Sequence, residues 1–203
     1  MKKVLLGITI AIAILGLNTN VFAGDIIKLP QPDLDSASAS FLQLLNNRQS
    51  GRSYDKDKRV DDVTLSEILW CARGINQYGK ITVPTALNSQ NLIVFVLKTN
   101  GIWLYNASEN QLEKISDRNM LPYLAERQNF IMDAPVNLVY TSSDKVWGFA
   151  YAGSAYQNVY LYAQAKGLDT VIRGLANDKK MAAALNLEPN EFTIVHQPVG
   201  YSK

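Results

Sequence analysis

The hydrophobic positions of this chain fall into helical and strand-like segments that follow one another along most of its length. Residues 149–166 form the longest helical pattern, and Gly167 follows it as a candidate C-terminal cap. Apolar positions within 36–47 mark one face of another helix. A third helix is predicted over 64–74, because its first four residues fit a capping box and Gly74 can end it.

Two shorter helices are predicted from polar residues that can cap their first turns. Asp and Asn are preferred at this position because their side chains accept hydrogen bonds from the free N–H groups of the first turn. Asp117 is a candidate cap for a helix that ends at Ala125. Either Asn177 or Asp178 can cap another helix that ends at Leu185.

The first strands are predicted from a continuous apolar run over 92–97, which is typical of a strand covered on both faces. Asn100-Gly101 then predicts a tight hairpin, from which residues 102–105 return as the second strand. Residues 112–115 follow after a short turn. This region is therefore expected to form an antiparallel meander.

Three later apolar segments, 136–140, 170–172 and 192–195, are predicted as further strands. Because helices and strands are mixed and one hairpin is evident, an all-parallel doubly wound sheet is excluded. The expected fold class is α+β, with helices packed on a mixed, largely antiparallel β-sheet. A chain of 203 residues with 47% hydrophobic residues suits one domain with a substantial core.

The first 23 residues are predicted to be a secretory signal peptide with cleavage after Ala23. Lys2 and Lys3 precede an apolar run over 4–17, and Val21 and Ala23 are small residues where signal peptidase requires them. The run is shorter than the roughly 18 to 20 residues that span a bilayer, so no stable membrane anchor is expected after cleavage. The mature protein is therefore expected to be periplasmic or secreted.

The mature chain is expected to consist of an extended arm and one domain. Prolines in the arm, residues 24–35, disfavour regular helix, and the domain covers 36–203. The single cysteine, Cys71, lies far from the cleavage point, which disfavours a lipid anchor, and it cannot form an internal disulfide.

Charge and histidine content exclude several classes of function. Removal of Lys2 and Lys3 lowers the number of Lys and Arg residues from 20 to 18, which equals the number of Asp and Glu residues. A neutral protein lacks the basic excess of nucleic-acid binders, so no nucleic-acid partner is expected. His196 is the only histidine and lies in an apolar segment, so neither a histidine-based triad nor a metal site is expected.

The clearest candidate for ligand binding is Arg48-Gln49-Ser50-Gly51-Arg52-Ser53. In an extended backbone, the side chains of Arg48, Ser50 and Arg52 point to the same side. Two guanidinium groups with a hydroxyl between them suit a phosphate. Taken alone, such a short basic cluster is also typical of a solvated surface.

Further segments downstream carry a resemblance to a known family. They occur in the same order and at similar separations as in the nitroreductase family of flavoproteins, and the chain resembles its short, thiazoline-oxidase-like branch. The resemblance covers nearly all of residues 36–203. It is carried by Arg48-x-Ser50-x-Arg52, Leu69–Ile75, Pro84–Gln90, Ala134–Val139, Gln157–Leu161, Gly167–Gly174 and Pro198–Tyr201.

The resemblance implies an FMN cofactor that performs the redox chemistry. It places Arg48, Ser50 and Arg52 at the phosphate and ribityl chain, with Gln49 next to the flavin ring. A second set lines the isoalloxazine, and a third lies on its opposite side through backbone groups, where a donor to N5 favours the reduced flavin. These two sets are Pro84, Thr85 and Asn88, and Ile172, Arg173 and Gly174.

The resemblance also implies a homodimer with its flavin pockets at the subunit interface. One stripe of the long helix carries Tyr151, Ser154, Ala155, Asn158 and Tyr162, which suits either a dimer core or packing within one chain. The expected function is that of an exported FMN-dependent oxidoreductase acting on a small organic substrate. The alternative is a non-catalytic periplasmic binding or accessory protein that retains the fold.

Overall fold

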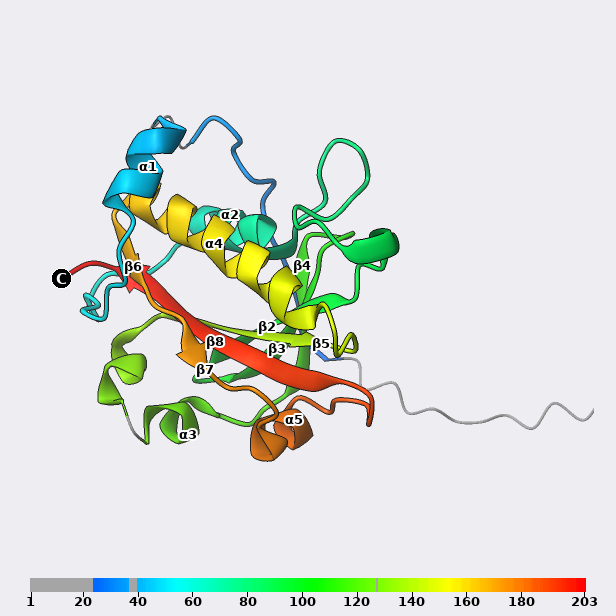
Figure 1. The fold of residues 1–203 in the computed structure, drawn as a ribbon. Helices are drawn as coiled ribbons and strands as arrows, with labels where there is room; N and C mark the ends of the chain where they lie inside the picture. Colours follow the sequence, from blue (N-terminus) through cyan, green and yellow to red (C-terminus); the bar gives the residue numbers. More distant parts are fainter. Residues whose placement is uncertain (1–23, 37–39, 127) are drawn as a thin grey trace, which may run out of the picture.

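The computed structural model describes residues 24–36, 40–126 and 128–203. An eight-stranded sheet lies between two layers of helices (Figure 1). The elements are, in chain order, β1 (Ile26–Lys28), α1 (Phe41–Asn47), α2 (Asp62–Arg73), η1 (Ala86–Asn88), β2 (Leu92–Lys98), β3 (Gly101–Asn106), β4 (Gln111–Ser116), α3 (Leu121–Ala125), η2 (Asn129–Asp133), β5 (Val136–Ser142), α4 (Gly148–Lys166), β6 (Leu168–Thr170), β7 (Arg173–Gly174), α5 (Lys179–Ala184) and β8 (Phe192–Tyr201).

The strand order is β1-β4-β3-β2-β5-β8-β6, and β7 also pairs with β8. All of these pairings, as far as the described residues show, are antiparallel. The α+β class and the largely antiparallel sheet are thereby confirmed. The predicted hairpin at Asn100-Gly101 and the meander of β2, β3 and β4 are confirmed as well.

The central strands β2 and β5 are buried on both faces, as the apolar run over 92–97 predicted. Alternate side chains of β2 enter different cores. Val94 and Val96 pack in the core beneath α2 and α4, whereas Phe95 and Leu97 pack in the core on the side of α3 and α5. The sheet therefore separates two hydrophobic cores, and α4 crosses one face of it along its full length (Figure 1).

Helix α2 begins earlier than predicted, and its cap is a different residue. The carboxylate of Asp61 accepts a hydrogen bond from the Thr64 backbone N–H at 2.7 Å, which lowers the pKa of Asp61. The capping box over 64–67 is therefore wrong. Glu67, its acidic member, is buried and accepts a hydrogen bond from the Tyr162 hydroxyl of α4, so it is not available to the helix start.

Of the other predicted caps, Gly74, Gly167 and Asp178 are confirmed, and Asp117 is wrong. Gly167 adopts a left-handed conformation with φ of 67° at the end of α4, and Asp178 caps α5 by accepting from the Met181 N–H at 2.8 Å. Asp117 caps nothing. Instead, the side chain of Asn119, two residues before α3 begins, accepts from the Leu121 N–H at 3.0 Å.

The segment that follows the predicted cleavage point joins the sheet. β1 pairs with β4, Leu29 is buried, and the Ser66 hydroxyl donates to the Pro30 carbonyl oxygen at 2.6 Å. The Asp33 N–H donates to Glu67 at 3.3 Å. Within the predicted arm, 24–35, residues Ile26–Lys28 form a strand that ties the arm to the domain, and residues 34 and 35 lie in a turn. The predicted signal peptide, 1–23, lies outside the described residues.

The apolar faces of α1 and α4 differ from each other in their environment. Within the predicted helix over 36–47, residues 37–39 are not described, and α1 leaves Phe41 60% and Leu42 73% exposed. By contrast, Tyr151, Ala155 and Tyr162 of the predicted α4 stripe are buried in the core of their own chain. Among the described helices, none is long and apolar enough to cross a membrane.

The last part of the sheet departs from the predicted boundaries. Residues 170–172 were expected as one strand, but β6 ends at Thr170 and β7 begins at Arg173. The predicted strand over 192–195 continues to Tyr201, because the following residues pair with both β5 and β6. The long strand β8 therefore pairs with both β6 and β7, which lie next to each other at this edge of the sheet.

Candidate functional site

A row of outward-facing peptide groups lines the edge formed by β6 and β7. Both strands pair with β8 in the same register, with Thr170 opposite Val199 and Gly174 opposite Val195. In antiparallel pairs, successive residues alternately bond to the partner strand and point away from it. The Thr170 carbonyl oxygen accepts from a residue outside the sheet, and the Ile172 N–H also donates outside it. Gly174, two positions further, therefore also faces outward.

The Arg48–Ser53 segment lies along this edge beside β6. The Gly51 N–H donates to the Thr170 carbonyl oxygen at 3.0 Å. A Cβ at Gly51 would lie about 2 Å from the Asp169 carboxylate, so a larger residue here would displace that carboxylate. The Ser53 carbonyl oxygen accepts from the Lys203 N–H at 3.0 Å, which brings a further basic residue to the segment.

Tyr160 of α4 connects this segment to the outward peptide row. Its hydroxyl oxygen lies 2.9 Å from Ser50 Oγ and accepts from the Ile172 N–H at 2.9 Å. The guanidinium carbon of Arg48 lies 5.1 Å from the centre of its ring. Sequence reasoning did not assign Tyr160 to the site, because an aromatic residue in a long amphipathic helix has the same pattern as a core residue.

The two arginines of the segment keep their charges available. Arg48 is half-buried and Arg52 is exposed, and neither forms an ion pair with any described residue. The Asp169 carboxylate, which lies against Gly51, accepts from the Ser53 N–H at 3.3 Å and the Ser202 hydroxyl at 2.8 Å. Gln49 is exposed next to them. This edge is therefore a concentrated source of hydrogen-bond donors.

The side chain of Arg173 belongs to a different environment from the Arg48 cluster. Its guanidinium donates to the Leu124 carbonyl oxygen at 2.9 Å and to Nδ1 of His196 at 3.0 Å. His196 Nε2 lies 3.1 Å from Oδ1 of buried Asn137. Burial, and then the charge of Arg173, lowers the pKa of His196 to about 3, so the ring is neutral and Nε2 carries the proton.

The predicted Pro84, Thr85 and Asn88 lie in a separate loop around η1. The Thr85 hydroxyl oxygen accepts from the Gln90 N–H at 3.2 Å. Asn88 has a positive φ of 54° and is exposed, as is Pro84. The N–H of Ala86 donates to the Tyr151 hydroxyl at 3.0 Å, which holds the loop beside the first half of α4.

One chain does not bring the Thr85 loop and the Arg48 segment together. Tyr151 marks the position of the loop along α4, and Tyr160 marks that of the arginine segment. Nine residues of helix separate the two tyrosines by about 14 Å at a rise of about 1.5 Å per residue. Figure 1 shows the two segments toward opposite ends of α4. The structure thus joins Arg48, Ser50 and Ile172 but leaves Thr85 and Asn88 apart.

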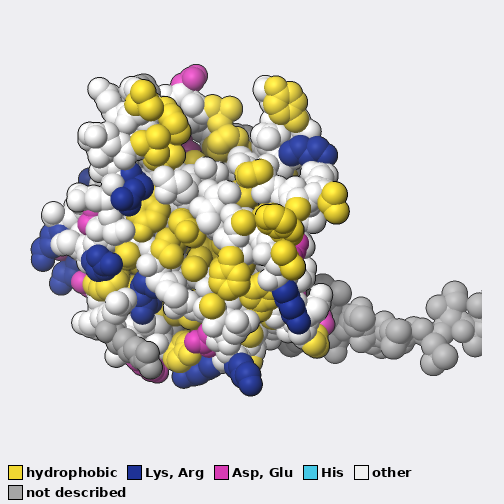
Figure 2. Space-filling model, in the orientation of Figure 1, with side chains coloured by type: hydrophobic (Ala, Val, Ile, Leu, Met, Phe, Trp, Pro, Cys, Tyr) yellow, Lys and Arg dark blue, Asp and Glu magenta, His cyan; other side chains and the backbone are white. Residues whose placement is uncertain are grey.

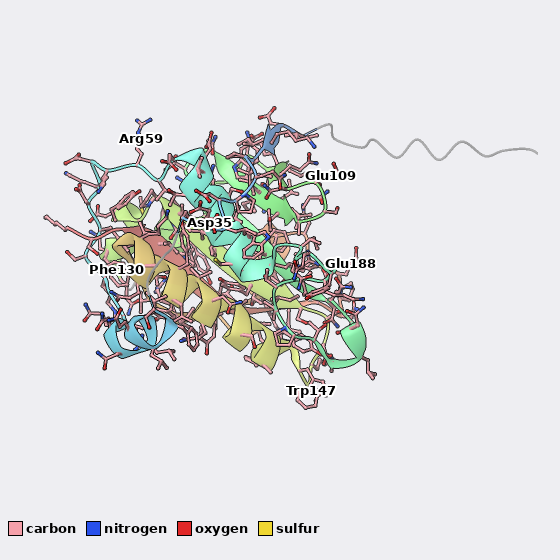
Figure 3. The ribbon with its side chains drawn as sticks, turned by 90° about the horizontal axis from the view of Figure 1, so that it is seen from above. Asp35, Arg59, Glu109, Phe130, Trp147 and Glu188 are labelled. Carbon is pink, nitrogen blue, oxygen red and sulfur yellow. The ribbon has the colours of Figure 1, made fainter. Side chains whose placement is uncertain are left out.

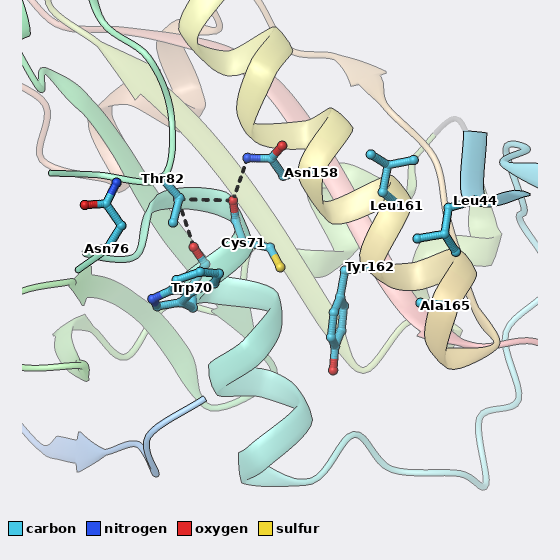
Figure 4. A pocket seen from close by; sticks show the side chains of 9 residues that line it. All are labelled: Leu44, Trp70, Cys71, Asn76, Thr82, Asn158, Leu161, Tyr162 and Ala165. Atoms are coloured by element: carbon cyan, nitrogen blue, oxygen red, sulfur yellow. Dashed lines mark hydrogen bonds between the residues drawn. The ribbon is translucent and has the colours of Figure 1, made fainter. Parts of the chain in front are cut away.

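An apolar groove of about 460 Å³ lies between α1, α2 and α4 (Figure 4). Asn158 Nδ2 donates to the Cys71 carbonyl oxygen at 3.1 Å, and the Thr82 hydroxyl donates to the Trp70 carbonyl oxygen at 2.9 Å. Burial raises the pKa of the Cys71 thiol to about 12, so the thiol stays protonated and is a poor nucleophile. The lining residues are Leu44, Trp70, Cys71, Asn76, Thr82, Asn158, Leu161, Tyr162 and Ala165.

Hydrophobic side chains are scattered widely over the face that carries α1 and α4 (Figure 2). Leu87 of the η1 loop is fully exposed, and Trp147 points away from the body of the molecule at the start of α4 (Figure 3). Within residues 24–36, 40–126 and 128–203, no cluster of three or more His, Cys, Asp or Glu side chains could hold a metal ion. Donors and apolar groups, rather than metal ligands, characterise this face.

Comparison with known proteins gives a consistent result. The model of the nitroreductase family matches residues 45–201. A candidate nitroreductase of Methanocaldococcus jannaschii is 29% identical over 198 residues, which cover 87% of this chain and 98% of that protein.

Solved structures agree with the sequence comparison. The crystal structure of a candidate nitroreductase from Ralstonia eutropha JMP134 matches with a TM-score of 0.78 and 26% identity, over 90% of this chain and 91% of that one. An FMN-dependent nitroreductase from Clostridium difficile R20291 shares the fold, with a TM-score of 0.59 and 19% identity over 80% of this chain and 88% of that one. With its family model covering most of the sequence and its fold matched by these structures, the chain belongs to the nitroreductase family of oxidoreductases.

Proposed function

We propose that this protein is an exported FMN-dependent oxidoreductase that transfers a hydride or two electrons to or from a small organic substrate. The observation that carries the proposal is the open sheet edge, where the Arg48–Ser53 segment and the outward peptide row of β6 and β7 adjoin. The FMN-dependent relative that shares the fold adds support.

The chemistry of the donors fits the phosphate end of FMN. Arg48 and Arg52 each present a planar fork of N–H groups, and neither forms an ion pair with a described side chain; Ser50 adds a hydroxyl between them. The backbone of Lys203 bonds to Ser53, so the Lys203 side chain can add a positive charge to the segment. These four residues would hold the phosphate and the ribityl chain.

The peptide row fits the ring end of the cofactor through Gly174. The Ile172 N–H is already bonded to Tyr160, and the register turns the Arg173 N–H toward β8. Gly174 is exposed, and the register turns its N–H away from β8, so a planar ring can approach this N–H at the open edge. When bound, FMN supplies reversible hydride acceptance at N5 of its isoalloxazine ring. A backbone donor held at that position stabilises the negative charge of the reduced ring.

A homodimer would complete this site. The Thr85 loop lies about 14 Å along α4 from the Arg48 segment. If two copies pack their α4 helices antiparallel about a twofold axis, the Thr85 and Asn88 side chains of one copy approach the Arg48 segment of the other. The exposed apolar residues of α1 and of the η1 loop would be covered in the same contact.

Export influences the choice of reaction. Nicotinamide cofactors are scarce outside the cytoplasm, and the chain lacks the glycine-rich fingerprint of a dinucleotide-binding sheet. Oxidation of an organic substrate, with electrons passed to another acceptor, therefore suits a periplasmic or secreted enzyme better than nitroreduction driven by NAD(P)H. The resemblance to the thiazoline-oxidase-like branch agrees with this direction.

The proposal is tested by purifying the chain from residue 24 onward and recording its visible spectrum before and after addition of FMN. We expect a bound flavin that is reduced by dithionite and reoxidised by a two-electron acceptor. Arg48→Ala/Arg52→Ala should lose the flavin, whereas Arg59→Ala, which removes an arginine that points into solvent (Figure 3), should keep it. No flavin binding would refute the enzyme assignment, and binding without turnover would favour the accessory role.

A further inference from the structure

We infer that Tyr160 is a positioning residue of the flavin site, which orients the Ser50 hydroxyl toward the phosphate and leaves Gly174 as the ring-facing donor. This inference rests on the proposed function. It is carried by one buried hydroxyl that touches two segments 122 positions apart in sequence, at Ser50 and Ile172.

The direction of the Ile172 hydrogen bond is fixed by its donor, and a phosphate that accepts from Ser50 sets the direction of the bond between the two hydroxyls. A backbone N–H can only donate, so the Tyr160 oxygen accepts from Ile172. The proton of the Tyr160 hydroxyl is then available for Ser50 Oγ, 2.9 Å away. Once Ser50 Oγ accepts that proton, its own O–H is left to donate to a ligand. A serine hydroxyl with this polarity matches the acceptor oxygens of a phosphate.

The same hydroxyl determines which peptide of the edge stays available. The N–H groups of Ile172 and Gly174 both face outward, and Tyr160 occupies the first of them. Without the Tyr160 hydroxyl, the Ile172 N–H would be a second unpaired donor on the same edge, two residues before Gly174. Tyr160 therefore selects a single donor position for the ring.

The tyrosine ring is held firmly enough to act in this way. It is 7% exposed, and the ring of Tyr156 packs against it edge-on, with the centroids 6.4 Å apart. On another side the Arg48 guanidinium lies over the ring. The hydroxyl is thus fixed between the phosphate-binding arginine and the peptide edge by packing within one chain.

Tyr160→Phe is the informative variant, because it removes the hydroxyl and keeps the ring under Arg48. Tyr156→Phe is the matched control, since it makes the same change one helical turn earlier at a hydroxyl for which the structure records no hydrogen bond. Ser50→Ala is a second variant at an exposed position, which leaves the Ile172 contact intact.

Two measurements test the inference. In the flavin-free protein, Tyr160→Phe should accelerate amide hydrogen exchange at Ile172 about tenfold or more, whereas Tyr156→Phe and Ser50→Ala should not. In titrations, Tyr160→Phe and Ser50→Ala should weaken FMN binding about tenfold, and both should reduce the preference for FMN over riboflavin. A wild-type protein that binds no FMN would overturn the proposed function. A wild-type protein that binds FMN with Tyr160→Phe indistinguishable from Tyr156→Phe would overturn the role of Tyr160 alone.

Discussion

The buried imidazole of His196 should lower the free energy of unfolding as the pH falls, and replacing His196 should abolish this part of the acid dependence. His196 is the only histidine of the chain and is fully buried. Its desolvation, together with the charge of Arg173, lowers its pKa to about 3 in the folded protein. The pKa of an unfolded histidine is about 6.5. The unfolded chain therefore takes up the proton first, and acid favours unfolding.

The size of the effect follows from these two pKa values. Between about pH 7 and pH 5 the unfolded histidine becomes almost fully protonated while the folded one stays neutral. The linkage relation then gives a loss of about 2 kcal/mol in the free energy of unfolding over this interval. Carboxylates contribute to the acid dependence as well, but they contribute equally to a variant that lacks only the imidazole.

The assay compares urea unfolding of wild type and His196→Gln at both pH values. Gln is chosen because its amide can both accept from Arg173 and donate to Asn137 without titrating. We expect wild type to lose about 2 kcal/mol more than the variant between the two pH values. As a direct check, the single histidine signal in the NMR spectrum should not shift above pH 5. An identical acid dependence in both proteins, or a histidine that titrates near 6.5, would refute this account.

Two further predictions concern assembly and helix capping. In the first, subunits that carry Arg48→Ala/Arg52→Ala are mixed with subunits that carry Thr85→Ala/Asn88→Gly. FMN binding should recover when the subunits exchange, because one of the two sites in each mixed dimer then has no substitution. Equilibrium dialysis measures the bound FMN, and no recovery would place each site within one chain. Asp178→Ala should lower the free energy of unfolding by about 2 kcal/mol, since the Met181 N–H and the Tyr123 hydroxyl both lose their hydrogen bond to Asp178; urea unfolding measures this, and Asp178→Asn should retain most of the stability.

Sequence patterns predicted the elements of the fold because the periodicity that defines them is local. The central strand over 92–97, the hairpin at Asn100-Gly101 and the Gly167 cap all depend on a few neighbouring residues. The start of α2 was missed for a tertiary reason. Glu67 fits a capping box by spacing, but α4 supplies it with Tyr162 and Lys166 as partners in the core.

The sequence proposed the residue types of the candidate site, and their spatial arrangement needed the structure. The R-x-S-x-R pattern predicted an anion-binding segment, and the structure links this segment to Ile172 through the Tyr160 hydroxyl. Nothing in the pattern around Tyr160 distinguishes a bridging hydroxyl from a core aromatic. The outward direction of Gly174 depends on the register of β7 with β8, which pairs segments about twenty residues apart. The separation of the Thr85 loop likewise follows only from the length of α4.

The central claim is that the arginines at the sheet edge bind the phosphate of FMN. It is tested most directly by comparing the dissociation constants of FMN and riboflavin, which lacks the phosphate, for wild type and Arg48→Ala/Arg52→Ala. We predict that wild type binds FMN about a hundredfold or more tightly than riboflavin, because two charge-assisted contacts hold the phosphate. The double variant should lose most of this preference and should bind riboflavin as tightly as wild type does. An equal preference for FMN in both proteins would contradict the account.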